Sequence, residues 1–301
     1  MIDINRAMKS RRLMRSLTGL DKKKFNNLLK DFTRVYKKQK MRVRVNRQRA
    51  DGGGRKHTLM QTKELLFFIL FYMKVYPTFD LAGFIFNVDK SQTNRWVHKL
   101  LPILEEALRQ KVLLPKRKIK DADEFISHFP GVKDLFIDVT ERPVQRKKRD
   151  KHQKREYSGK KKRHTRQSTV AVDENKNILY VYKVRPGKQH DKKIFEKSDL
   201  PYVIPKGVTL WVDLGYQGIK NHTSLDVMMP HKKPKGKKLT DEQKAENRII
   251  SSLRMVVENS IGGVKRYGSV ANIYRNKIAD TDNKIFDIAC GLWNLHISEA
   301  A

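Results

Sequence analysis

The spacing of apolar residues changes near residue 130, and this change constrains the fold more than any other feature of the sequence. Residues 61–115 carry apolar side chains at helical spacing, whereas residues 130–230 contain short runs rich in β-branched and aromatic residues. Helical spacing returns at 239–266 and 281–298. We therefore predict an all-α region followed by an α/β region, in which helices flank a mixed sheet.

Four apolar runs predict the strands of the α/β region. The run at 134–140 (DLFIDVT) is the first. Residues 168–184 contain two strands joined by a turn-forming Asp-Glu-Asn-Lys-Asn segment. The runs at 208–213 (VTLWVD) and 225–230 (LDVMMP) complete the set, and the last of them is the weakest.

The most apolar run of the chain, Leu65–Met73, predicts a buried helix rather than a membrane span. It is far shorter than the roughly 20 residues that cross a bilayer. Lys63 and Glu64 precede it directly, and Lys74 follows it. We expect this helix to start near Thr62 and to end before Pro77.

A helix-turn-helix is predicted from the segment that follows. A short helical pattern is followed by a turn at 87–89 and by a second helix, for which Ser91 is the expected N-cap. An ordinary helical hairpin would give the same pattern. In a helix-turn-helix the first residues of the second helix reach base edges in the major groove. Here these candidate DNA contacts are Ser91, Gln92, Asn94 and Arg95.

The net charge of the chain indicates a polyanionic partner. Lys and Arg number 66 against 32 Asp and Glu, a net charge of +34, whereas solubility of a small domain needs a magnitude of about 2–8. Nucleic acid is the expected partner, and an anionic membrane is the weaker alternative. We expect double-stranded DNA and no membrane.

Two basic segments stand out. Residues 37–49 contain no acid, and Asp51–Gly54 follow as an expected linker. Residues 146–166 hold twelve Lys or Arg and two acids. A solvated surface loop is one reading of the second segment. We predict instead that it contacts phosphates, with these residues in the centre: Lys160, Lys161, Lys162 and Arg163.

The single cysteine, Cys290, excludes a disulfide within the chain and a cysteine-based zinc site. It lies near the apolar stripe of the helix at 281–298, so we expect it to pack in the core; Thr281 or Asp282 is the expected cap of that helix. The first residues show no continuous apolar signal core. A cytoplasmic location is expected, in association with the nucleoid if the source is bacterial.

Two predicted strands end in an acid, Asp138 in LFIDVT and Asp213 in LWVDLG. A single strand-end Asp most often forms a turn or caps a helix. Two of them can converge, because α/β sheets gather functional groups at strand ends. Gly215 and Gly218 follow Asp213 and would allow a sharp turn after it.

A third acid, Glu258, lies in the helical pattern at 239–266. At about 100° per residue, Arg254, Glu258 and Lys265 share one helix face. An exposed Arg–Glu pair is the simpler reading. The adjacent Gly262 and Gly263 argue against a purely structural helix, because each costs about 1 kcal/mol in a helix interior; they would let DNA or a strand come close.

Taken together, these motifs resemble the DDE-type insertion-sequence transposases of the branch related to Harbinger elements. The resemblance covers nearly the whole chain from about residue 60. Its strongest matches are 157–165 (YSGKKKRHT), 186–191 (PGKQHD), 213–218 (DLGYQG) and the Arg254-x3-Glu258-x6-Lys265 spacing. Many relatives carry Tyr three residues before the Arg, where this chain has Ser251.

The resemblance implies a ribonuclease-H-like fold and an acid triad of Asp138, Asp213 and Glu258, which would be both catalytic and metal-binding. It implies Mg²⁺ or Mn²⁺, as two ions, and strand transfer after phosphodiester hydrolysis. Arg254 and Lys265 would contact DNA. His190 and Asp191 would either support the metal ligands or cap the helix that follows them.

The expected organisation is a basic arm at 1–60, which is partly helical around 21–36, followed by a helix-turn-helix domain at 61–118 and a catalytic domain at 130–301. Joining two element ends makes a homo-oligomer on DNA the expected active form. Two alternatives remain open at this point. One is a domesticated or inactive relative that only binds DNA, and the other is a metal-dependent nuclease without strand transfer.

Overall fold

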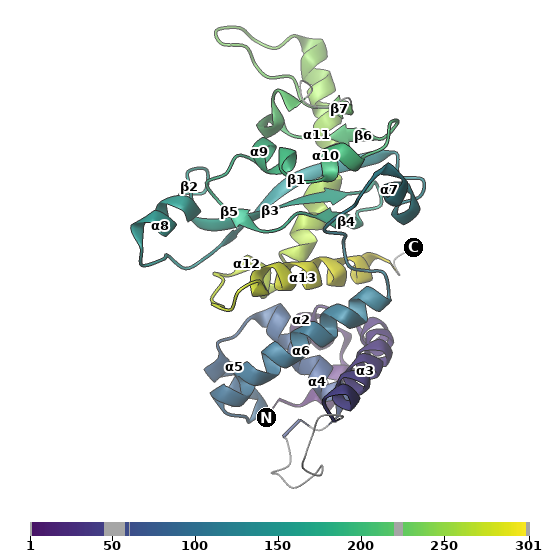
Figure 1. The fold of residues 1–301 in the computed structure, drawn as a ribbon, viewed down its shortest axis with the longest axis vertical. Helices are drawn as coiled ribbons and strands as arrows, with labels where there is room; N and C mark the ends of the chain where they lie inside the picture. The colour runs from purple at the N-terminus through teal and green to yellow at the C-terminus, as the bar shows by residue number, and fades with distance from the viewer. Residues whose placement is uncertain (1, 45–57, 60, 220–224, 299–301) are drawn as a thin grey trace. The chain divides into compact units, whose positions relative to one another are not determined.

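The computed structural model describes residues 2–44, 58–59, 61–219 and 225–298, which form two compact units (Figure 1). The first unit comprises Met1–Leu114, Lys265–Asn272 and Asn276–Ala301, and the second comprises Pro115–Val264 and Ile273–Arg275. These units are defined by packing alone. The domain boundaries expected from the sequence therefore stay predictions.

Within its described residues the first unit is helical. Its helices are α1 (Ile4–Lys9), α2 (Arg11–Thr18), α3 (Lys22–Arg44), α4 (Thr62–Val75), α5 (Phe79–Phe86), α6 (Lys90–Gln110), α12 (Gly268–Ala271) and α13 (Thr281–Ile297). The predicted α4 is confirmed, and every residue of Leu65–Met73 is buried.

The N-terminal region is more ordered than the sequence analysis expected. A helix was predicted only around 21–36, yet α1, α2 and α3 span most of residues 4–44. Phe25, Leu28 and Phe32 are fully buried on one face of α3, and their helical spacing agrees with the helix predicted there. The remainder of the basic segment, 45–49, and the expected linker Asp51–Gly54 lie outside the described residues.

Helices α5 and α6 are joined by a tight turn, as predicted. Asn87 ends α5 in the left-handed conformation, with φ of 55°. A Cβ on Gly83 would lie 2.5 Å from the Val88 carbonyl oxygen, so only glycine allows this approach. The expected N-cap, Ser91, was wrong. Asp89 caps α6, because its side chain accepts a hydrogen bond from the Gln92 N–H at 2.9 Å, and α6 begins at Lys90.

Helix α13 is buried along most of its length, and Cys290 is fully buried in it. Its packing role is consistent with the sequence prediction. The predicted cap was wrong, because Asp280 is the N-cap residue and makes no capping bond through its side chain.

The second unit is built on a mixed sheet. Its elements are α7 (Ala122–His128), β1 (Asp134–Pro143), α8 (Asp150–Glu156), β2 (Tyr157–Ser158), β3 (Arg163–Val172), β4 (Ile178–Val181), β5 (Arg185–Pro186), α9 (Asp191–Glu196), α10 (Leu200–Val203), β6 (Thr209–Trp211), the 3-10 helix η1 (Leu214–Tyr216), β7 (Asp226–Met228) and α11 (Asp241–Val264). The predicted strands are confirmed, and so is the mixed α/β class.

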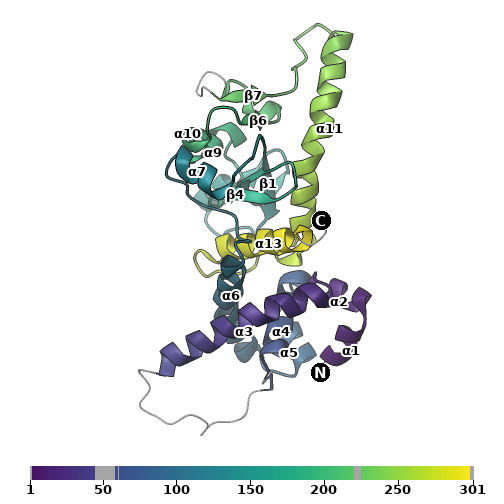
Figure 2. The ribbon, with the colours of Figure 1, turned by 90° about the vertical axis from the view of Figure 1, so that its right-hand side faces the viewer.

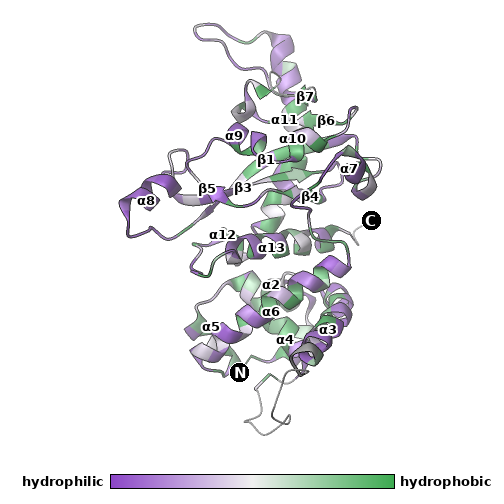
Figure 3. Ribbon diagram, in the orientation of Figure 1, coloured by the Kyte–Doolittle hydropathy of each residue, from purple (hydrophilic) through white to green (hydrophobic). Residues whose placement is uncertain are grey.

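The strand order is β2-β3-β1-β6-β7, and β4 and β5 also pair with β3. Strand β1 pairs antiparallel with β3 and parallel with β6, and β6 pairs parallel with β7. Figure 2 shows α11 along one face of the sheet and α7, α9 and α10 on the other. The apolar centre of the sheet lies between these layers, and the outlying segments are hydrophilic (Figure 3).

The basic segment 146–166 is more than a loop. Its residues form the short helix α8, strand β2 and the start of β3. Glu156, at the end of α8, is buried and accepts a hydrogen bond from Arg166 Nε at 3.0 Å. One of the two acids in this segment is therefore used to fix the turn, while the lysines at 160–162 stay exposed.

Two glycines of the second unit should respond oppositely to alanine. At Gly187 a Cβ would lie 1.9 Å from Thr165 Oγ1, so Gly187→Ala should lower the free energy of unfolding by about 1–3 kcal/mol. At Gly262 a Cβ meets nothing within 4 Å. Gly262→Ala, the matched control, should therefore gain up to about 1 kcal/mol from helix propensity. Urea unfolding checks both, and equal effects would contradict the packing at Gly187.

Candidate active site

The sheet register brings Asp138 and Asp213 together, but Asp138 lies in the middle of β1 rather than at its end as the sequence predicted, because β1 continues along β3 to Pro143. Phe136 of β1 lies opposite Trp211 of β6 in the parallel pair. Asp138 and Asp213 each lie two residues further along, and adjacent strands are about 4.8 Å apart. The Phe136 and Trp211 rings stack with centroids 5.9 Å apart. Trp211 Nε1 also donates to Asp134 Oδ1 at 2.7 Å, which fixes the register.

Asp138 is half-buried in β1, and burial raises the pKa of its carboxyl group. The Val139 N–H, which donates to Asp138 Oδ1 at 2.8 Å, and the Arg254 guanidinium both lower this pKa. The charge of Asp213 raises it again, and Lys160 lowers it. The two acids are therefore electrostatic neighbours, with two cations beside them.

A third carboxylate, Asp191, belongs to the same group. It is the first residue of α9, and burial raises its pKa to about 6. Lys160 lowers this pKa, while Asp213 and Asp138 raise it. The sequence analysis left two roles open for His190 and Asp191. His190 is the N-cap residue of α9 but makes no capping bond through its side chain, and it is exposed.

The loop before α9 is held by a buried glutamine. Gln167 of β3 is 1% exposed. Its Nε2 donates to the carbonyl oxygens of Pro186 at 3.2 Å and Gln189 at 2.6 Å. Gly187, in the same loop, lies against Thr165 of β3, and the Gly187 N–H donates to the Thr165 carbonyl oxygen at 3.0 Å. These contacts hold the loop that leads to Asp191, which lies beside Asp138 and Asp213.

Glycines allow the carboxylates to approach one another. The Gly215 N–H donates to Asp213 Oδ1 at 2.7 Å. A Cβ on Gly215 would lie 2.8 Å from that oxygen and 3.4 Å from Asp191 Oδ2. Gly218 has φ of 78°, in the left-handed region. The sharp turn predicted after Asp213 is thus present, and a side chain at 215 would push the two acids apart.

Sequence reasoning missed one residue of this site, Tyr216. Its side chain is fully buried, and its hydroxyl has no hydrogen-bond partner within the described residues. Burial raises the pKa of the phenol well above its ordinary value, and the charges of Asp191, Asp138 and Asp213 add to this effect. The only sequence signal was its place inside the DLGYQG motif.

Glu258 does not join this group in the structure. Its residue in α11 is exposed, whereas Arg254, one turn earlier, is half-buried beside Asp138. Among the described residues, no three His, Cys, Asp or Glu side chains are spaced to hold a metal ion. The predicted helix to 266 ends at Val264, so Lys265 lies just beyond it and is exposed.

The remaining predicted DNA contacts lie on two separate elements. Ser91 and Arg95 are exposed in the first turns of α6, and Gln92 and Asn94 are half-buried there. The other set is exposed at the turn that joins β2 and β3, and it comprises Lys160, Lys161, Lys162 and Arg163. Of these, Lys160 is close enough to Asp138 and Asp191 to lower their pKa values.

Comparison with known proteins gives the family of the chain. Residues 137–294 match the DDE superfamily endonuclease family, and residues 57–110 match the helix-turn-helix of that superfamily. The chain belongs to the DDE superfamily of endonucleases. Over 267 residues it is 30% identical to a probable transposase for insertion sequence element IS702 from Microchaete diplosiphon, covering 88% of each chain. No solved structure matches.

Membership of this superfamily confirms the resemblance, the helix-turn-helix and an enzyme that acts on DNA. It also implies dependence on a divalent metal. The side chains are of the type that binds such an ion. Clustered carboxylates repel one another and raise one another's pKa when no cation lies between them, and a bound cation would relieve this repulsion. Hard cations take oxygen ligands of this type.

In the described part of the chain, no helix is long and apolar enough to cross a membrane.

Tyr216 and Tyr180 form a matched pair for testing the site. Tyr180 is buried in the same core, and its hydroxyl donates to Asp199 Oδ1 at 2.7 Å. Tyr180→Phe should cost about 1–3 kcal/mol of unfolding free energy, because it leaves a carboxylate oxygen without its donor. Tyr216→Phe should cost nothing or stabilise. Urea unfolding of both variants measures this, and an equal loss would mean that the Tyr216 hydroxyl has a partner.

Proposed function

We propose that this protein is a transposase that binds the ends of a mobile element and cuts and joins DNA there. The observation that carries this proposal is the pair of acids in a strongly basic chain, Asp138 within β1 and Asp213 just after β6, both two residues beyond the parallel pairing of these strands. The relative from Microchaete diplosiphon, a probable transposase, supports the step from endonuclease to transposition.

Asp138, Asp213 and Glu258 are the proposed ligands of two Mg²⁺ or Mn²⁺ ions. When bound, such ions activate a hydroxyl nucleophile and stabilise the leaving oxygen of a phosphodiester. Glu258 lies one helical turn from Arg254, which is beside Asp138. It would complete the ligand set on the bound DNA. Asp191, the first residue of α9, lies next to Asp213 and would support the metal ligands as a neighbouring negative charge.

The cations around the acids hold the rest of the DNA. Arg254 Nε is buried and has no hydrogen-bond partner within the described residues. It can therefore donate to a phosphate oxygen next to the cut. Lys160 approaches the acids from the β2–β3 turn, and Lys161, Lys162 and Arg163 extend the contact. Lys265, just after α11, would bind a further phosphate.

The reaction proceeds in two steps of the same kind. Water attacks phosphorus at the element end, and the bond to the 3′ oxygen breaks, which leaves a 5′ phosphate and a free 3′-OH. That 3′-OH then attacks a phosphorus of target DNA and displaces the 3′ oxygen of the target strand. Because two ends must be joined, the active form is proposed to be a homo-oligomer on DNA.

Conservative changes of the three acids test the reaction. Asp138→Asn, Asp213→Asn and Glu258→Gln should each lower cleavage and joining at least a hundredfold while DNA binding is retained. The substrate is a plasmid carrying this gene with its flanking DNA, incubated with Mg²⁺. Glu242→Gln, at an exposed acid earlier on α11, is the matched control and should stay active.

The products separate the alternatives. Nicked but never joined DNA from the wild type would indicate a nuclease without strand transfer. Binding without nicking would indicate a relative that has lost catalysis. Either result contradicts the proposed function, and an active Glu258→Gln variant would remove Glu258 from the ligand set.

The helix-turn-helix is tested by two arginines of α6. Arg95 is exposed near the start of the helix, whereas Arg109, near its end, pairs with Glu105 and Glu106 at 3.2 Å. Each change to Ala removes one charge from the same helix. Arg95→Ala should weaken binding of element-end DNA about tenfold or more, by 1–3 kcal/mol, and Arg109→Ala should have little effect. Equal losses in a fluorescence binding assay would contradict the docking of the α6 N-terminus.

A further inference from the structure

A second lysine-rich segment lies between β7 and α11, outside every element assigned above. Residues 231–240 read HKKPKGKKLT and contain no acid. Residues 231–238 are all exposed. We call residues 232–238 the lysine loop, and its cations are Lys232, Lys233, Lys235, Lys237 and Lys238.

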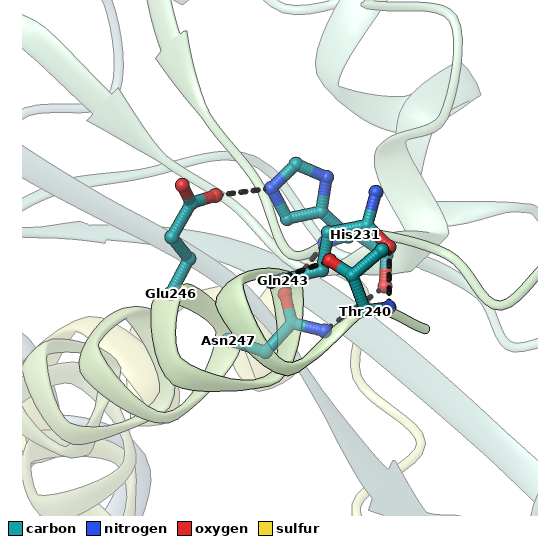
Figure 4. A network of polar contacts seen from close by, with 5 residues as sticks. All are labelled: His231, Thr240, Gln243, Glu246 and Asn247. Atoms are coloured by element: carbon teal, nitrogen blue, oxygen red, sulfur yellow. Dashed lines mark hydrogen bonds and ion pairs between the residues drawn. The ribbon is translucent and has the colours of Figure 1, made fainter. Parts of the chain in front are cut away.

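One end of the lysine loop is fastened to α11 through His231 (Figure 4). The His231 N–H donates to Asn247 Oδ1 at 2.7 Å, and Asn247 Nδ2 donates to the His231 carbonyl oxygen at 3.1 Å. The His231 ring also contacts the Glu246 carboxylate. Three contacts thus hold the residue at which the loop begins.

The other end is fastened by a reciprocal pair at the start of α11. The Thr240 N–H donates to Gln243 Oε1, and the Gln243 N–H donates to Thr240 Oγ1, both at 3.2 Å. Within the loop, Gly236 has φ of 76°, and the Lys237 N–H donates to the Pro234 carbonyl oxygen at 3.3 Å. The loop is therefore held at both ends and turned in the middle, which presets the positions of its lysines.

None of these five lysines forms a salt bridge with a described residue. Among the described residues, no carboxylate lies within 4.0 Å of any of their ammonium groups, whereas nearby Lys244 pairs with Asp241 at 2.8 Å. Lys232 Nζ instead donates to Gln217 Oε1 at 2.9 Å. A fixed run of like charges repels itself. An anionic chain laid across it would remove that repulsion.

Gln217 ties the loop to the acid site. It directly follows η1, which begins one residue after Asp213. The loop itself leaves the sheet from β7, whereas Lys160 and its neighbours leave it from β2. Strands β2 and β7 are at opposite ends of the strand order, with β1 and β6 between them. Basic segments therefore lie at both ends of the sheet, with the acids between them.

We infer that the lysine loop binds the phosphate backbone of DNA on the β7 side of the acid site, opposite the segment at 160–163. Each lysine would neutralise one phosphate and release its counterion. This inference rests on the proposed function, because it takes DNA at the acids as given. It adds a second DNA contact, which would set the direction in which the DNA strand runs away from Asp213.

The test is the salt dependence of DNA binding by the full chain. The probe is a fluorescent 40-base-pair duplex of arbitrary sequence. Lys233, Lys235, Lys237 and Lys238 are changed to Ala together, and Lys232 is kept because it bonds Gln217. Four lost phosphate contacts lower the slope of log K against log salt by up to about 3.6, at about 0.9 for each contact. We expect a reduction of at least about 2.

The matched control removes the same charge elsewhere in the second unit. Lys133 and Lys206 lie before β1 and β6, at the ends of these strands remote from the acids, and Lys118 and Lys120 lie in the segment before α7. All four are exposed. Their joint change to Ala should alter the slope by less than about 1. Equal slopes in the two quadruple variants overturn the inference.

A second variant separates position from charge. His231→Ala with Asn247→Ala keeps all five lysines but releases the loop from α11. Affinity for the duplex should fall about threefold or more at low salt, because the lysines are no longer preset. Unchanged affinity overturns the claim that the anchors position the loop. Failure of the wild type to cleave DNA would contradict the proposed function. The binding comparisons would still show whether the lysine loop contacts DNA.

Discussion

The parallel pairing of β1 with β6 is the constraint on which the site depends. Phe136 and Trp211 are opposite each other in this pair, so the acids two residues beyond them arrive at the same end of the sheet. A register slip of one residue would turn one acid to the other face. The ring stacking of these aromatics and the bond from Trp211 to Asp134 oppose such a slip.

The acids are clustered inside a strongly basic chain. A net charge of +34 attracts DNA over the whole surface, yet the reacting phosphate must be met by cations that touch its oxygens. Carboxylates held together inside a basic protein suit divalent ions, which take oxygen ligands. Burial is the largest effect on Asp138 and raises its pKa, whereas Lys160 and Arg254 lower it. In the proposed function the acids hold the ions while the lysines outside bind the flanking phosphates.

Much of this architecture followed from local sequence pattern. The strand runs, the helix at Leu65–Met73 and the turn before α6 were predictable because apolar spacing and turn residues act over a few positions. The N-cap of α6 was missed because two acceptors, Asp89 and Ser91, compete within three residues. The short helices α1 and α2 were missed because their buried apolar residues are few, namely Ile4, Ala7 and Met14.

The proximity of Asp138 and Asp213 was predictable, whereas their surroundings were less so. Asp191 reaches Asp213 only because Gln167 and Gly187 hold a loop from a distant part of the chain. Tyr216 is a core residue by composition, and only its unpartnered hydroxyl relates it to the acids. Glu258 shows the reverse case, since its motif is clear in sequence while its side chain lies outside the group of acids.

The most direct test of the account is whether Asp213 helps to bind a divalent ion. Thermal unfolding of the wild type, Asp213→Asn and Asp226→Asn would be followed with and without Mn²⁺. Asp226 is an exposed acid on β7 and serves as the control. The account predicts that Mn²⁺ raises the Tm of the wild type and of Asp226→Asn by several degrees, because it binds the folded state. Asp213→Asn should start no less stable and gain little. An equal gain in all three proteins would contradict a metal site at Asp138 and Asp213.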